Sequence, residues 1–159
     1  MNGFSTRIGK LTVLAALLVG APGLLVATSD ARELDEHVTS LIEKTLDATT
    51  QAQAFDELQT LGCEAVPVII RLMDDRRPLP NHAISLENKS PDAFEGVRHY
   101  GPEQVVDALA AILNQVTGES FGFIYNGASD DERAETVKSW REYLDRVGPK
   151  GVCGASEPN

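Results

Sequence analysis

Residues 118–122, Gly-Glu-Ser-Phe-Gly, match the Gly-x-Ser-x-Gly pattern that holds the nucleophilic serine of many hydrolases. In those enzymes a strand leads into the serine turn, a helix follows at once, and a histidine comes later in the chain. Here an apolar helical pattern over 102–117 precedes Ser120, and the last histidine is His99. The pattern therefore favours a turn between core elements, and a nucleophilic Ser120 is the competing interpretation.

Cys63 is a second candidate for chemistry, because it lies near the expected start of a helix, where the helix dipole lowers the pKa of a thiol. His37 or His99 could accept its proton, so the alternative function is a small hydrolase that uses Ser120 or Cys63. The competing interpretation is structural, because Cys153 is the only other cysteine and both follow the export signal described below. We predict a Cys63–Cys153 disulfide; a buried apolar cysteine is the remaining possibility.

Acidic clusters and histidines are the remaining candidates for metal binding. Asp74–Asp75 and Asp130–Glu132 lack the alternating acidic spacing that wraps a calcium ion. The histidines are scattered, without the spacings that are typical of zinc sites, and there is no phosphate-binding loop motif. We expect the first acidic cluster to end a helix and the second to begin one. The sequence thus predicts no metal and no cofactor.

The first 31 residues have the parts of an export signal: a basic start, an apolar run and a site of small residues. Cleavage after Ala31 is preferred, and cleavage after Ser29 is the alternative. The competing interpretation is an uncleaved membrane anchor, since Leu11–Ala27 spans 17 residues, the short limit for a membrane helix. We expect an exported protein, periplasmic or secreted, with no membrane insertion after cleavage.

The chain is acidic. Removing residues 1–31 takes away two basic residues and one acidic residue, so the formal charge changes from −10 to −11 over the remaining 128 residues. Such a charge repels nucleic-acid phosphates and anionic lipid surfaces, and no cluster of Lys and Arg offers a local exception. Nucleic acids are therefore excluded as partners.

The mature chain is expected to form one α-helical domain over 32–148, followed by a tail over 149–159. Apolar residues recur at helical spacing, and Ser129 with Glu132 forms a capping-box pattern before the last helix. Gly62, Gly118 and Gly148 suit helix ends. The expected helices cover 33–49, 52–62, 63–75, 102–117 and 130–147. The predicted fold class is all-α, with about five helices and one long loop insertion.

The long connection Arg76–Gly101 is polar and contains prolines, and connections of this length are often functional. It combines planar donors with an aromatic ring, a mixture that is enriched at interface hot spots. We therefore expect partner-binding residues there, and they are Arg76, Arg77, Asn88, Lys89, Arg98, His99 and Tyr100. The alternative is structural: Arg76 and Arg77 balance the dipole of the preceding helix, and Tyr100 packs beside Pro102.

Residues 54–75, AFDELQTLGCEAVPVIIRLMDD, resemble a HEAT-like repeat, which has the form A-x-x-x-L-x-x-L-G followed by A-V-P-x-L-I-x-x-L-x-D. The later stretch LNQVTGESFGFIYNG, with a following Trp-containing helix, resembles the terminal region of bacterial exported HEAT-like proteins. The match includes one convincing repeat, whereas a solenoid usually needs about three. A short HEAT-like array and a compact helical bundle are both open.

HEAT-like proteins are generally helical scaffolds that bind other macromolecules, and the resemblance carries over no catalytic residues. It implies a non-catalytic exported scaffold that binds a protein partner. An inhibitor or immunity-type protein that neutralises a secreted effector is one concrete form, and the negative charge would suit a basic target.

Overall fold

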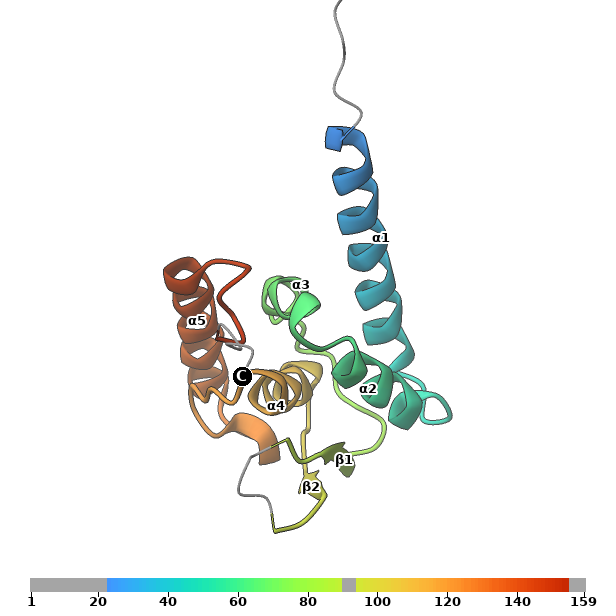
Figure 1. The fold of residues 1–159 in the computed structure, drawn as a ribbon. Helices are drawn as coiled ribbons and strands as arrows, with labels where there is room; N and C mark the ends of the chain where they lie inside the picture. The colour runs from blue at the N-terminus through green and yellow to red at the C-terminus, as the bar shows by residue number, and fades with distance from the viewer. Residues whose placement is uncertain (1–22, 90–93, 155–159) are drawn as a thin grey trace, which may run out of the picture.

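The computed structural model describes residues 23–89 and 94–154, with side chains from Ser29 onwards. Most of the predicted export signal, residues 1–22, lies outside the described residues. Five α-helices and two short 3₁₀ helices make up most of the fold (Figure 1). The α-helices are α1 (Gly23–Lys44), α2 (Gln51–Thr60), α3 (Val66–Arg71), α4 (Val105–Thr117) and α5 (Asp130–Val147), and the 3₁₀ helices are η1 (Gly62–Glu64) and η2 (Ile124–Asn126).

The prediction of a purely all-α fold is wrong, because the long connection contains an antiparallel hairpin. Its strands are β1 (Ile84–Glu87) and β2 (Val97–Tyr100), and Ile84 pairs with Tyr100. In β1 the buried residues Ile84 and Leu86 alternate with exposed Ser85 and Glu87. This period of two is the pattern of a strand with one buried face. The mainly helical character and the number of helices are confirmed.

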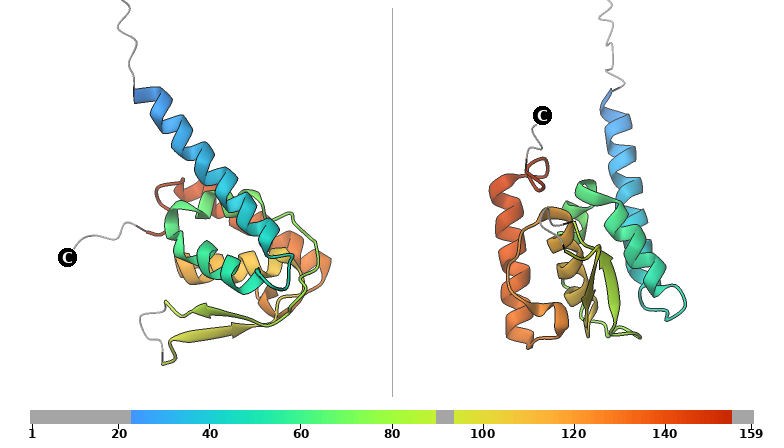
Figure 2. Two further views of the ribbon diagram at one scale, coloured as in Figure 1. Left: turned by 90° about the vertical axis from the view of Figure 1, so that its right-hand side faces the viewer. Right: turned by 60° about the horizontal axis from the view of Figure 1, so that its bottom comes forward.

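Helix α4 is the centre of the core. Every residue from Val105 to Leu113 is buried, and α2, α3, β1 and η2 all pack around the helix. Figure 2 shows α4 enclosed between the other elements, with α5 on the opposite side from α2. A helix that is apolar on nearly all sides is stable only in such a position.

Helices α2 and α3 do not form the tight helical hairpin that the repeat pattern predicts. Helix α2 packs mainly on α1, β1 and α4, helix α3 packs mainly on α5 and α4, and η1 separates the two. Helix α3 is also only 6 residues long. The two helices therefore share α4 as a common support.

Local hydrogen bonds set the ends of the helices, and some of these ends differ from the predicted ranges. The first helix ends at Lys44 rather than at 49, and the Asp47 carboxylate accepts the backbone N–H of Thr49 in the turn that follows. The last helix begins after Ser129 as predicted, and the capping box with Glu132 is present. It ends before Gly148, which has a positive φ of 71°.

Helix α4 begins at Val105 rather than at Pro102, because Asp107 defines its start. The Asp107 carboxylate accepts the backbone N–H groups of Glu103 and Gln104. The same carboxylate pairs with Arg133 of α5, whose side chain is 4% exposed, at 2.8 Å. Arg133 also reaches Glu103 at 3.1 Å. This buried network joins α5 to the first turn of α4.

The predicted Cys63–Cys153 disulfide is confirmed, with the two Cα atoms 5.9 Å apart. It ties η1 to the segment that follows α5, over a sequence separation of 90 residues. The Tyr143 hydroxyl donates to the carbonyl of Val152 at 2.6 Å, and the Val152 side chain is buried. The segment after α5 is therefore held by packing as well as by the bond.

None of the helices in the described part of the chain is long and apolar enough to cross a membrane.

Candidate binding site at the outer edge of the hairpin

The predicted partner-binding residues fall into separate parts of the molecule. Asn88, Lys89, Arg98 and His99 lie on or next to the hairpin and are exposed or partly exposed. Tyr100 is on the hairpin as well, but its side chain is buried. The remaining two, Arg76 and Arg77, follow α3.

Arg77 serves the fold. Its guanidinium donates from Nη1 and Nη2 to the two carboxylate oxygens of Glu43, both at 2.8 Å, and it also bonds Asp75. The paired guanidinium lowers the pKa of Glu43. The pair connects the end of α1 to the turn after α3. Arg76 lies nearby, beside Asp74 and Arg141, away from the hairpin residues.

Tyr100 is a core residue, as the structural alternative expected, although its contacts differ. Its hydroxyl accepts a hydrogen bond from Nε2 of Gln115 on α4. Its ring meets that of Tyr125 edge to face, with the ring centres 5.6 Å apart. The backbone N–H of Gly101, next in the chain, donates to Oδ1 of Asn126 at 2.8 Å. These contacts anchor the end of β2 to α4 and η2.

Two glutamines of α2 take outward backbone groups on the β1 side of the hairpin, at Glu87 in the strand and at Asn81 before it, whereas the outward groups of Ser85 make no hydrogen bond within the described residues. The N–H of Asn88 donates to the carbonyl of Gly96 at 3.0 Å, so even-numbered residues of β1 bond to β2 and odd-numbered ones face away. The outward N–H and C=O of Glu87 are both taken by the Gln59 amide, at 2.9 and 2.8 Å. The Gln51 amide bonds to the backbone N–H and C=O of Asn81 in the same way, at 3.0 and 2.7 Å.

The outer edge of β2 is open. The same alternation turns the backbone N–H and C=O groups of Val97 and His99 away from β1. Within residues 23–89 and 94–154, no group pairs with them from that side. In the left view of Figure 2, β2 lies along the lower border of the molecule, outside β1. Unpaired strand edges are templates for pairing with another chain.

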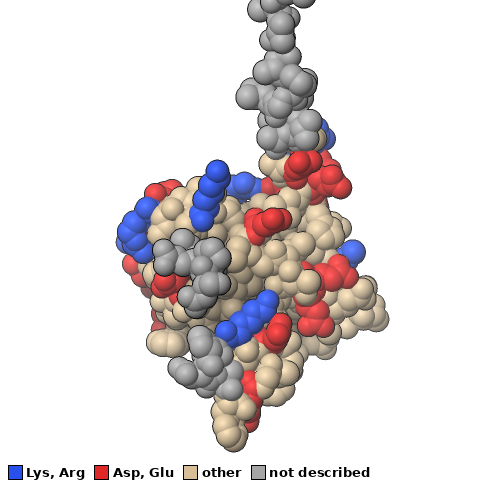
Figure 3. Space-filling model, viewed as in Figure 1, with Lys and Arg blue, Asp and Glu red and all other residues tan. Residues whose placement is uncertain are grey.

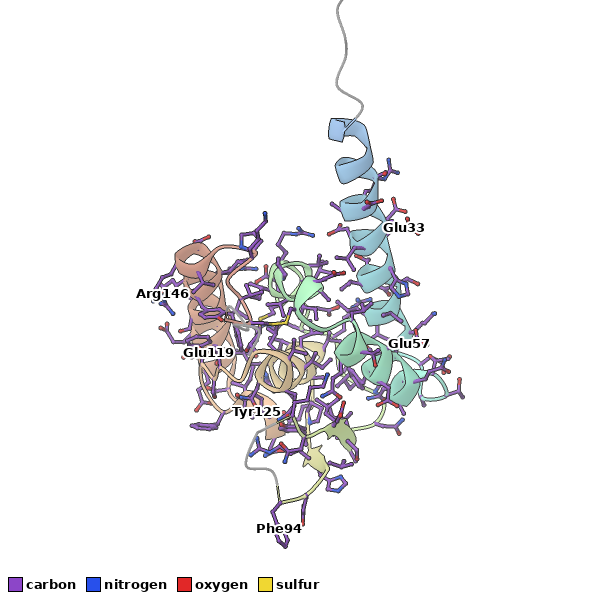
Figure 4. All side chains as sticks on the ribbon, viewed as in Figure 1. Glu33, Glu57, Phe94, Glu119, Tyr125 and Arg146 are labelled. Carbon is purple, nitrogen blue, oxygen red and sulfur yellow. A yellow bond between two sulfur atoms is a disulfide. The ribbon has the colours of Figure 1, made fainter. Side chains whose placement is uncertain are left out.

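Two exposed apolar side chains lie beside this edge. Phe94 is 100% exposed and Val97 is 42% exposed, and Phe123 is the other large apolar side chain exposed in the described part of the chain. Figure 4 shows Phe94 pointing away from the body of the protein at the tip of the hairpin. Phe94 lies within the long connection in the sequence, but only the structure shows that its ring is fully exposed.

Arg98 points to the opposite face of β2 from Val97, into a hollow of about 410 Å³ at the end of α4. Among the described residues its lining contains two cationic side chains and no carboxylate: Lys89, Arg98, Asn114, Gln115, Val116, Thr117 and Gly118. We call this the cationic hollow. In the described part of the chain the Arg98 side chain has neither a hydrogen bond nor an ion pair, whereas the Lys89 ammonium lies 3.8 Å from the Glu87 carboxylate.

The cationic hollow is unusual on this acidic protein. Figure 3 shows acidic side chains gathered along α1 and several basic ones near the α5 side of the same face. Arg71, Arg77, Arg133 and Arg141 are each paired with a carboxylate, whereas Arg146 lies over the Tyr143 ring and, like Arg98, has no carboxylate partner among the described residues. An exposed guanidinium without a carboxylate partner is available to an anionic group from outside.

The residues named for catalysis have structural partners. The Ser120 hydroxyl hydrogen-bonds to that of Tyr125 at 2.8 Å. Burial raises the pKa of Tyr125, which the Ser120 hydrogen bond and the nearby charge of Arg98 partly offset. Cys63 has no thiol, because its sulfur is in the disulfide. No group of three His, Cys, Asp or Glu side chains suited to a metal occurs among the described residues.

Comparison of the chain with protein-family models, with curated proteins and with solved structures finds no match.

Proposed function

We propose that this protein is an exported, non-catalytic, helical scaffold that binds a protein partner through its β-hairpin. The observation that carries the proposal is the exposure of Phe94 and Val97 near the guanidinium of Arg98, which has no partner in the described part of the chain. Aromatic residues and arginine are enriched in the energetically important parts of interfaces. A solvated apolar tip next to an open strand edge is costly in a protein that meets no partner.

Export is part of the proposal and has two independent supports. One is the signal-like sequence of residues 1–31, and the other is the Cys63–Cys153 disulfide, since such bonds persist in oxidising compartments outside the cytoplasm. Mature protein that begins at Arg32 in an envelope or culture fraction is the expected result of fractionation with N-terminal sequencing. Full-length protein confined to the cytoplasm would contradict export.

An inhibitor or immunity-type protein remains the concrete form of the proposal. The formal charge of −10 favours encounter with a basic effector, because long-range attraction raises association rates. The hairpin would then supply the short-range contacts. The alternative, a small hydrolase that uses Ser120 or Cys63, gains no support from the contacts of either residue. Fast stoichiometric labelling of the folded protein by a serine-directed probe would favour the hydrolase.

The binding function is tested by capture from an envelope extract with matched phenylalanine variants. Phe94→Ser removes the exposed ring at the hairpin, and Phe123→Ser removes a ring that is 86% exposed on the loop before α5. We expect the wild-type protein and F123S to retain the same partner, and F94S to lose it while unfolding at the same temperature. Equal retention by both variants, or no specific partner for the wild type, would overturn the proposed function.

A further inference from the structure

We propose that the partner contributes an extended segment that adds to the outer edge of β2 as a third strand, with an acidic side chain that pairs with Arg98. The inference rests on the proposed function and specifies the mode of binding and the chemistry of the partner.

The open edge has defined ends. The carbonyl of Glu95 accepts a hydrogen bond from Nδ2 of Asn88 at 3.0 Å, and the N–H of Gly101 is taken by Asn126 at 2.8 Å. Between these two points, Val97 and His99 present two N–H and two C=O groups outward. An added strand of about four or five residues covers such an edge, given a rise of about 3.4 Å per residue.

Strand alternation fixes what the added segment must carry. Val97 and His99 lie on the solvent face of the hairpin, and Arg98 lies on the other face, toward the cationic hollow. A residue of the added strand directly opposite Arg98 would have its Cβ atom about 5 Å from that of Arg98. Its side chain therefore enters the hollow, whereas its neighbours in sequence lie beside Val97.

The chemistry of the hollow selects an acidic residue at that position. Arg98 and Lys89 are its charged lining groups, and Arg98 has no partner in the described part of the chain. A carboxylate that reaches Arg98 makes a bidentate pair, which adds geometric specificity to the backbone hydrogen bonds. On the solvent face, an apolar side chain covers the partly exposed Val97. The expected segment alternates acidic and apolar residues.

A second copy of this chain fits the edge poorly. The symmetric antiparallel pairing that uses all four outward groups places Val97 opposite the other copy's His99. Arg98 then faces Arg98 of the other copy, and like charges directly opposite each other are destabilising. Each copy also carries a formal charge of −10, so the two repel at long range. The occupant is therefore a segment of a different protein.

The test uses the full chain with its disulfide and two capped seven-residue peptides. One alternates valine with glutamate, and the matched peptide alternates valine with lysine. We expect the glutamate peptide to bind at least about tenfold more tightly than the lysine peptide, a difference of about 1.4 kcal/mol. In the complex, hydrogen exchange of the Val97 and His99 amides should slow at least about tenfold. The Arg98→Gln variant should lose most of the preference for the glutamate peptide, with Lys89 as the one cation left among the described lining residues, while keeping its unfolding temperature.

Three results would overturn the inference. They are equal binding of the two peptides by the wild type, binding without protection of the Val97 and His99 amides, and a concentration-dependent dimer that protects these amides without peptide. The capture experiment and the peptide experiment together distinguish a failure of this inference from a failure of the proposed function. If the envelope partner is captured through Phe94 but leaves both amides unprotected, the strand-addition mode is wrong and the binding function stands. If no partner is captured but the glutamate peptide protects both amides, the β2 edge accepts an added strand and the proposed function is wrong.

Discussion

The two outer edges of the hairpin differ in how their backbone groups are satisfied. On the β1 side, the Gln59 amide bonds to the N–H and C=O of Glu87, and the Gln51 amide does the same at Asn81 before the strand, so that within the described residues only Ser85 keeps uncovered outward groups in β1. On the β2 side, Val97 and His99 have no such cover in the described residues. Proteins commonly protect strand edges against pairing with other chains. The open edge of β2 lies beside Arg98, whose side chain has no carboxylate partner in the described residues, and this combination indicates a place for binding.

The comparison also separates stability from recognition. Groups on the β1 side and in the helices beneath it hold the hairpin on the body, whereas groups on the β2 side are solvated. Changes on the first side should therefore alter the free energy of unfolding, and changes on the second should alter binding alone.

The largest effect is expected from removing the disulfide. The double variant Cys63→Ala with Cys153→Ala should lower the free energy of unfolding by about 4 to 5 kcal/mol, the chain-entropy value for a loop of about 90 residues. Urea unfolding measures the loss. The bond lies in the helical body, so the folded fraction should still bind the glutamate peptide. Loss of peptide binding at unchanged stability would show that the two regions are not independent.

Arg133→Met should be the next most damaging change, at about 3 to 5 kcal/mol, because it leaves the fully buried carboxylate of Asp107 without its cation. Lys138→Met on the exposed side of α5 is the matched control, since Lys138 is 60% exposed and its pairs lie within the helix. Thermal and urea unfolding of both variants measure the difference. Similar stabilities for the two would contradict a structural role for the buried pair.

Gln59→Leu tests the covered edge directly. It removes two hydrogen bonds to Glu87, which should cost about 1 to 3 kcal/mol, and it opens the β1 edge. Hydrogen exchange of the Glu87 amide should accelerate by at least about tenfold. Gln53→Leu is the control, because Gln53 bonds only to the side chain of Glu57 on the exposed face of α2. Unchanged exchange at Glu87 would mean that Gln59 does not protect this edge.

Val97→Pro should have the smallest effect on stability, within about 1 kcal/mol, because proline is tolerated at edge positions whose N–H faces solvent. It should nevertheless abolish binding of the glutamate peptide, since one of the two outward donors is lost. Arg98→Pro is the matched comparison: it removes an N–H that bonds to β1 and should destabilise the hairpin measurably. Equal loss of stability in the two variants would contradict the assigned register.

Much of the helical framework could be predicted from the sequence. The capping box at Ser129 and Glu132, the apolar face of α4 and the disulfide follow from local patterns or from the small number of cysteines. The hairpin could not be predicted in the same way. Each strand is only four residues long, and Val97, Arg98 and His99 show no alternation of apolar and polar types.

The candidate site was predicted as a region, but the roles within it were not. The sequence names Arg77 and Arg98 alike, yet Arg77 is paired with Glu43, and Arg98 has no partner in the described part of the chain. That difference depends on contacts between residues more than 30 positions apart. The directions of Arg98 and His99 likewise follow from the register with β1, which a single strand does not reveal.

The Cys63–Cys153 bond also sets an order of events during biosynthesis. One sulfur precedes α3 and the other follows α5, so the central helix α4 and both strands lie between them in the chain. Because a polypeptide is synthesised from its N-terminus, Cys63 cannot pair with Cys153 until the chain has been made beyond α5. Oxidation to the Cys63–Cys153 pairing is therefore a late step, which follows the synthesis of all five α-helices of the described part of the chain. The reduced chain must first find its own arrangement before the two sulfurs come within reach.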